Sequence, residues 1–273
     1  MTKAVVVIFI TLFTLLQGLY AHSFEIGTHR ELSERAVRSS NMDGILKTQL
    51  NFLFGVDDFV SNKRVFRVVA DGSSLEDDFP RFCNHFHNPL RTWDQAGLEL
   101  PIPILFVCGS ENHSSVLWGQ SPALQPAGQR FTWQDARQSF FQGLTATSQA
   151  QREAYLADTF RALGQLIHLV QDVAVPAHTR NDQHLGFEGF ESFVENTRNT
   201  NTTLFEQLTN SSTGFDTTIL TLSPNPLAPI PIARIIDTTD PEQAEAVPSA
   251  GTNVGMAEYS NANFLSGDTI FTF

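Results

Sequence analysis

The chain has 273 residues, of which 41% are hydrophobic, enough to bury the core of one medium-sized domain. Its formal net charge is −12 and no run of Lys or Arg stands out, so the composition does not indicate a basic surface that steers nucleic acid. A metal cluster could still attract phosphate locally. Two cysteines are too few for a disulfide scaffold.

Residues 1–23 have the pattern of an export signal. Lys3 supplies a positive start, and residues 4–16 form an apolar run that is short for a bilayer span. Ala21 and Ser23 then place small residues at the −3 and −1 positions of a cleavage site. Cleavage there leaves a single mature domain, residues 24–273, that is secreted or periplasmic. An uncleaved anchor is the less favoured alternative, and the abrupt end leaves open a missing C-terminal portion.

The first third of the mature chain predicts two helices and then irregular segments. Thr28 and Glu31 form a capping box, so the first helix is expected to start at His29. A second helix is expected over residues 42–54. Mixed or Pro-, Gly- and Ser-rich composition predicts loops over residues 57–92 and 97–130.

The two cysteines have three interpretations. In an oxidising compartment Cys83 and Cys108 could pair and close a loop. Cys83 could instead ligate a metal, although thiolates favour closed structural sites over hydrolytic ones. A disulfide is preferred, and two free buried thiols remain open.

Two further helices follow. Thr132 caps the first, whose apolar residues are expected to face inward: Trp133, Phe140, Phe141 and Leu144. Ser148 and Gln151 form another capping box that opens a long central helix ending near Ala174. Its core stripe recurs at spacings of four and three: Leu156, Phe160, Leu163, Ile167 and Val170.

The central helix carries His168 and Asp172, four residues apart and therefore on one face. Pro176 cannot continue the helix, so His178 falls just past a kink or end, where the chain can turn it towards the same centre. One His and one Asp on an apolar helix usually form a structural hydrogen bond. Five of the other histidines lie beside Asp, Glu or Asn, which favours a metal site instead.

Four stretches in order resemble the zinc-dependent phospholipase C / P1 nuclease superfamily, and together they cover most of residues 24–196. The central motif is His168-x3-Asp172-x5-His178 with Pro176 two residues before the last His. The other matching stretches are Thr28-His29-Arg-Glu-Leu, Glu76-Asp77…Asn84-His85-Phe86-His87-Asn88-Pro89, and Phe190-Glu191-Ser-Phe-Val-Glu195. The resemblance implies an all-α fold, a phospholipase C/P1 nuclease-like helical bundle with long irregular loops. The last helix is expected over residues 256–264.

The resemblance also implies up to three Zn²⁺ ions. The first would be held by Asp77, His85, His168 and Asp172, with Asp172 bridging to the second. The second would add His29 and the amino group and carbonyl of Phe24, the expected mature N-terminal residue. The third would be held by His178, His184 and Glu191. Asp77 is the expected catalytic group, orienting or deprotonating the attacking water.

Three assignments keep alternatives. Phe24 stands where the family normally has Trp, and Asp78 could replace Asp77. His184 and Glu188 reproduce the phospholipases' His-x3-Glu spacing, whereas Glu191 matches the surrounding sequence and is preferred. The unused glutamates would be a solvated helix face.

The function expected from the resemblance is phospholipase C-like hydrolysis of phosphate esters. Its substrate would be a phospholipid or other phosphodiester met in transient contact with a membrane surface, and the enzyme would be a monomer. The alternatives are a P1-type single-strand nuclease and a non-catalytic exported protein with the same fold.

Overall fold

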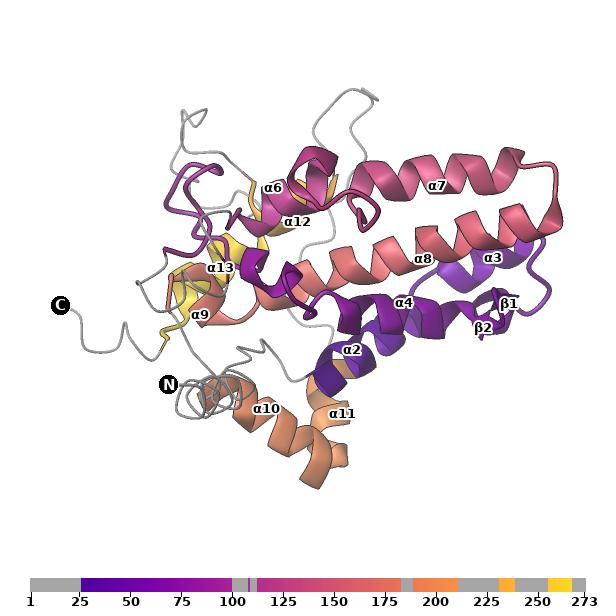
Figure 1. The fold of residues 1–273 in the computed structure, drawn as a ribbon. Coiled ribbons are helices and arrows are strands. Elements are labelled where there is room, and N and C mark those ends of the chain that lie inside the picture. Colours follow the sequence, from indigo (N-terminus) through magenta and orange to yellow (C-terminus); the bar gives the residue numbers. More distant parts are fainter. Residues whose placement is uncertain are drawn as a thin grey trace, which may run out of the picture.

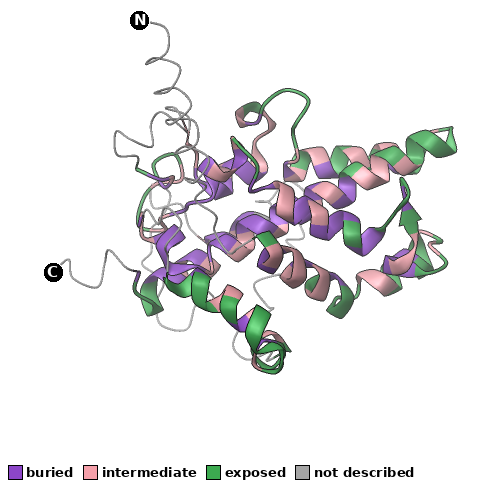
Figure 2. Ribbon diagram, turned by 60° about the horizontal axis from the view of Figure 1, so that its bottom comes forward, coloured by how far each residue is buried: buried purple, intermediate pink, exposed green. Residues whose placement is uncertain are grey.

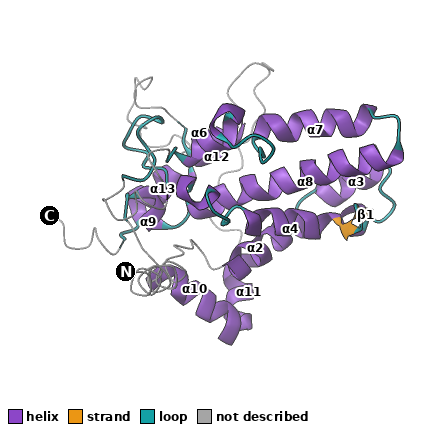
Figure 3. Ribbon diagram, viewed as in Figure 1, coloured by secondary structure: helices purple, strands orange, loops and turns teal. Residues whose placement is uncertain are grey.

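The computed structural model describes residues 26–99, 108, 112–182, 189–210, 231–238 and 255–266. Over these residues the protein is mainly helical, as the sequence predicts, and its strands are a single hairpin (Figure 3). In this hairpin Phe59–Val60 (β1) pairs with Lys63–Arg64 (β2) across Ser61 and Asn62, both at positive φ. Within the same residues, no helix combines the length and the apolar character that a bilayer span needs.

The longest helix, Gln149–Asp172 (α8), lies at the centre of the fold (Figure 1). On one side it packs against Trp133–Thr145 (α7), and on another against Val65–Leu75 (α4). Ile26–Ser39 (α2) packs against α4. Met42–Gln49 (α3) follows α2 in the chain and lies near the hairpin. The remaining elements are three short 3₁₀ turns, Gly55–Asp57 (η1), Arg81–Asn84 (η2) and Pro122–Leu124 (η3), and the helices Ser115–Gln120 (α6), Pro176–Thr179 (α9), Gly189–Thr200 (α10), Thr202–Asn210 (α11), Pro231–Ile236 (α12) and Met256–Asn263 (α13).

The apolar core follows α8 in two clusters. Figure 2 shows that buried residues gather on the inner helices of the fold. Towards the N-terminal half of α8, Phe160 packs with Val65, Phe66 and Val69 of α4, and Leu156, Leu163 and Ile167 join them. Towards its C-terminal half, Leu166, Leu169 and Val173 pack with Trp118 of α6 and Ile236 of α12. The stripe predicted along this helix is confirmed, including Val170 at the second cluster.

Several predicted boundaries are confirmed. Thr132 and Asp135 form a full capping box at the start of α7, and the Ser148 hydroxyl accepts a hydrogen bond from the Gln151 N–H at the start of α8. The central helix ends at Asp172, and Pro176 occupies the first turn of α9, where its missing N–H costs nothing. The last described helix, α13, ends one residue before the expected position.

Two helix ends were predicted wrongly. The first helix begins at Ile26 rather than His29, because Thr28 does not cap it and instead donates a hydrogen bond to Glu195 of α10 at 2.6 Å. The second ends at Gln49, because Asn51 takes a positive φ of 58° and the Phe52 N–H turns back to the Leu46 carbonyl.

Two regions also differ from expectation. The two segments predicted as loops contain helices: residues 57–92 include α4, which is discussed below, and residues 97–130 include α6. On α7, Trp133 is partly buried, but Phe140, Phe141 and Leu144 are exposed at the end of the helix that extends beyond the core.

Candidate metal centre

The C-terminal end of α8 supplies the first two polar groups of the site. His168 and Asp172 lie one helical turn apart and are fully buried, with Nε2 of His168 at 3.1 Å from Oδ2 of Asp172. The chain then turns through an extended Val175 into α9. This turn brings back the buried His178, whose Nδ1 lies 3.7 Å from the same Asp172 oxygen.

Helix α2 brings a third histidine to the other carboxylate oxygen. Nε2 of His29 lies 3.2 Å from Oδ1 of Asp172, and the ring stacks on that of His168 with centroids 3.8 Å apart. His29 is fully buried because it lies on the inner face of α2, which also carries the buried Ser33 and Val37.

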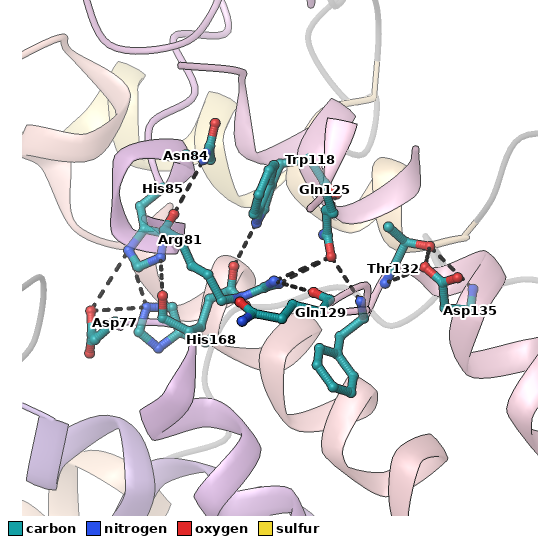
Figure 4. A network of polar contacts seen from close by, with 12 residues as sticks. Asp77, Arg81, Asn84, His85, Trp118, Gln125, Gln129, Thr132, Asp135 and His168 are labelled. Atoms are coloured by element: carbon teal, nitrogen blue, oxygen red, sulfur yellow. Dashed lines mark hydrogen bonds and ion pairs between the residues drawn. The ribbon is translucent and has the colours of Figure 1, made fainter. Parts of the chain in front are cut away.

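The segment after α4 completes the buried cluster (Figure 4). Nδ1 of His85 lies 2.8 Å from Oδ2 of Asp172 and 3.3 Å from Nε2 of His168. Oδ1 of Asp77 lies 3.5 Å from Nε2 of His168 and 3.8 Å from Nδ1 of His85. Figure 4 shows the side chains of Asp77, His85 and His168 pointing towards one another.

Glu191, in the first turn of α10, extends the cluster beyond His178. Its Oε1 lies 3.6 Å from Nε2 of His178, so the two ring nitrogens of His178 face two different carboxylates. Glu195 points elsewhere, to Thr28 and Arg198.

These side chains form two groups with the spacing of metal ligands, in each of which the ligand atoms lie within 4.8 Å of one another: His29, His168 and Asp172, and Asp77, His85 and His168. All four carboxylate oxygens of Asp77 and Asp172 are buried and accept no hydrogen bond from a described residue. Leaving buried carboxylate oxygens without donors is costly unless a cation satisfies them. Imidazole nitrogen with carboxylate oxygen is a ligand set that suits zinc, so the residues fit a buried metal ion.

Burial and charge set the protonation states. Burial by itself favours the neutral carboxyl of Asp172, but its interactions with His168, His85 and His178 outweigh it and hold the pKa of Asp172 well below its usual value. Burial lowers the pKa of His168 to about 3. An ionised carboxylate and a neutral imidazole are the forms that bind a metal.

The pKa values of Asp77, His29 and His85 are all raised. Burial raises the pKa of Asp77 well above its usual value, and the charge of Asp172 adds to the shift. Burial lowers the pKa of His29 and of His85, but for both the nearby carboxylate of Asp172 outweighs it, so both values are raised.

Two of the histidines are oriented by a hydrogen bond on the far side of the ring. Nδ1 of His29 lies 2.6 Å from Oε1 of Gln171, and Nε2 of His85 lies 3.1 Å from the backbone carbonyl of Glu76. In the neutral imidazole the ring nitrogen that donates to an oxygen carries the proton, so the other nitrogen, the one facing Asp172, is the unprotonated one.

A buried ion pair fixes the segment that carries Asp77 and His85. The Glu76 carboxylate accepts hydrogen bonds from Nε of Arg81 and Nε1 of Trp118, both at 2.7 Å. Arg81 also donates to Gln125 and to the Gln129 carbonyl (Figure 4). A disulfide between Cys83 and Cys108 closes a neighbouring loop, so the preferred interpretation of the two cysteines is confirmed.

The structure therefore brings together seven of the residues expected at the site: His29, Asp77, His85, His168, Asp172, His178 and Glu191. Asp78 is exposed, which favours Asp77. Phe24, His184 and Glu188 lie outside the described residues.

Three residues that contact buried histidines in or near the site could not be identified from the sequence. Gln171 and the Glu76 carbonyl orient ligands, and Asp237, which directly follows α12, pairs with the buried His87, with Nε2 of His87 at 2.8 Å from its Oδ2. Glu76 is next to Asp77 in the chain, a weak signal. Asp237 is 150 residues from His87, and the sequence contains no signal that pairs the two.

No protein-family model, curated protein or solved structure matches this chain significantly.

Proposed function

We propose that this protein is an exported zinc-dependent hydrolase that cleaves phosphodiesters in the manner of a phospholipase C. The observation that carries the proposal is the environment of Asp172: a fully buried, ionised carboxylate with imidazole nitrogens of His29, His85 and His168 within 3.2 Å. A purely structural carboxylate does not need three buried histidines. The order and spacing of the same residues resemble the zinc-dependent phospholipase C / P1 nuclease superfamily.

The proposed ligands fall into three sets, one for each ion, according to where they lie in the cluster. Asp77, His85 and His168 would hold one ion, with Asp172 shared between it and a second ion bound by His29. The pair His178 and Glu191, farther along the cluster, would contribute to a third. Phe24, His184 and Glu188 remain proposals from the sequence alone.

Zinc bound there would polarise a phosphate oxygen and lower the pKa of water to about 7. Asp77 would act as the general base: its raised pKa places it closer to neutral pH than an ordinary carboxyl, and its oxygens accept no hydrogen bond from a described residue. Burial of the ligands excludes bulk water and strengthens each electrostatic contact.

Export is part of the proposal. Residues 1–23 have the sequence pattern of a signal peptide, and the Cys83–Cys108 disulfide is typical of an oxidising compartment. An acidic protein with a net charge of −12 is better suited to zwitterionic phospholipid or soluble esters than to nucleic acid.

The test combines zinc analysis of the mature protein with a panel of phosphodiesters: phospholipid, a soluble aryl phosphodiester and single-stranded nucleic acid. We expect two or three zinc ions and hydrolysis of phospholipid that a chelator abolishes and zinc restores. Asp77→Asn should lower kcat by about 100- to 10,000-fold, the range of general acid–base catalysis, whereas Asp78→Asn, an exposed neighbour, should not. Preference for single-stranded nucleic acid would instead favour a P1-type nuclease, and chelator-resistant activity would exclude both.

A further inference from the structure

Gln171 links the buried histidine of α2 to a second residue of the same helix. Its Oε1 lies 2.6 Å from Nδ1 of His29, and its Nε2 donates to Oγ of Ser33 at 3.1 Å. His29 and Ser33 are one helical turn apart on α2, so a single amide from α8 spans both. In this orientation the amide oxygen faces the histidine and the amide NH2 group faces the Ser33 hydroxyl.

The direction of this amide determines the tautomer of His29. An oxygen at Nδ1 requires a proton there, and Nε2, which faces Asp172 at 3.2 Å, is then left with its lone pair. If the amide were absent, the proton could move to Nε2 and donate to Asp172, which would block both atoms as ligands. Gln171 therefore favours the tautomer that binds a cation.

This effect is confined to one half of the cluster. Gln171 contacts His29, which belongs with His168 and Asp172 to only one of the two ligand groups. The other group contains His85, whose orienting acceptor is the backbone carbonyl of Glu76. The two groups share His168 but have separate orienting partners.

We propose that Gln171 is a positioning residue that sets the affinity of the ion bound at His29 and leaves the ion at Asp77 and His85 unchanged. The inference rests on the metal centre of the proposed function. It concerns metal binding, so it is tested without a substrate.

The experiment is a zinc titration of the metal-stripped mature protein, by calorimetry with a competing chelator, on the wild type and three variants. Gln171→Leu removes the acceptor and should weaken one zinc site by about 10- to 100-fold, the usual effect of losing an outer partner of a ligating histidine. Gln171→Glu keeps an acceptor at Nδ1 and should bind zinc nearly as tightly as the wild type.

Gln165→Leu is the matched control. Gln165 lies on the same helix, is buried, and its amide makes no hydrogen bond to a described residue, so both zinc affinities should stay unchanged. Circular dichroism of the metal-free variants checks that each is folded. In the zinc-loaded wild type, ¹⁵N NMR of the imidazoles should show a proton on Nδ1 of His29, and this signal should be changed in Gln171→Leu only.

Several results would overturn the inference: unchanged affinities in Gln171→Leu, equal weakening of both sites, or no rescue by Gln171→Glu. Zinc binding without phosphodiester hydrolysis would remove the proposed function alone. A wild-type protein that binds no zinc would overturn both.

Discussion

Asp172 is the residue on which the charge balance of the centre depends. Its two oxygens face different histidines, with Oδ1 near His29 and Oδ2 near His85 and His168. One carboxylate therefore serves both ligand groups, directly in one and by proximity in the other. Asn, the neutral isostere of Asp, would keep the shape of the Asp172 side chain and remove its negative charge from both ligand groups.

Asp172→Asn should accordingly lose two zinc ions together, and not one. Asp158→Asn changes an exposed carboxylate on the same helix and should retain the wild-type metal content. Elemental analysis after dialysis against trace zinc measures both variants. Retention of a full complement by Asp172→Asn would show that the carboxylate is not shared.

The raised pKa values of His29 and His85 predict how zinc stabilisation depends on pH. Because both values are raised above 6.5 in the folded, metal-free protein, their contribution to its stability is fully present below pH 6.5 and is lost as the pH rises through the folded values. Asp77, also raised, acts in the same direction. His168, lowered to about 3, acts oppositely but only below pH 6.5.

Zinc needs the deprotonated imidazoles, so protons compete with it at low pH. The increase in Tm on adding zinc should be larger at pH 8 than at pH 6. Differential scanning calorimetry of the metal-free and zinc-loaded protein at the two pH values measures it. An equal or smaller increase at pH 8 would mean that these histidines do not compete for the ion.

At this scale the sequence predicted much of the cluster. Spacing placed His168 and Asp172 on one face, Pro176 predicted the break before His178, and motif order added His29, Asp77, His85 and Glu191. Gln171 could not be predicted, because its role depends on how close α2 lies to α8. Helical periodicity along α8 carries no information about that distance.

At the scale of elements, the site depends on the close crossing of α4 and α8. A Cβ on Gly164 of α8 would lie 2.0 Å from the Val69 carbonyl oxygen, and one on Gly72 of α4 would lie 2.3 Å from the Arg161 carbonyl oxygen. Two glycines thus let the backbones meet. Asp77 follows α4 by two residues, and His168 follows Gly164 by four, so this contact helps to set the distance between them.

Gly164→Ala should therefore destabilise the protein, because backbone atoms of α4 cannot move aside as a flexible side chain can. We expect a loss of about 1–3 kcal/mol or more of the free energy of unfolding, the usual cost of overpacking, measured by urea denaturation. Gly44→Ala on α3 meets nothing within 4 Å and should be neutral or stabilise by up to about 1 kcal/mol. Equal effects of the two substitutions would show that the crossing is loose.

The same crossing explains which elements the sequence predicted. Helix α8 has capping residues, a long apolar stripe and a proline beyond its end, and its start and end were correctly expected. Helix α4 was not predicted, because the composition of Asp71-Gly72-Ser73-Ser74 is typical of a loop. Gly72 and Ser73 are nevertheless the small residues that the crossing of α4 and α8 requires. Phe140, Phe141 and Leu144 were expected inside because periodicity cannot show where a core ends.

At the scale of the whole molecule, the disulfide connects the export proposal with the metal centre. Cys83 lies in η2, two residues before His85, and its partner Cys108 is 25 residues away. The bond restricts the unfolded chain and tethers the segment that carries a ligand. Both effects depend on folding in an oxidising compartment.

Replacing both cysteines by Ala should lower the free energy of unfolding by about 3–4 kcal/mol, the chain-entropy cost of a loop of this length. Each single replacement breaks the same bond, so either should cost nearly as much as the pair. Urea denaturation of the metal-free protein measures this loss. Zinc should recover part of it, because binding to the folded state adds stability by mass action. Wild-type protein produced in an oxidising compartment should contain no free thiol by a thiol assay under denaturing conditions. Free thiols in that material would contradict the presence of the disulfide. A double variant as stable as the wild type would show that the disulfide does not stabilise the protein.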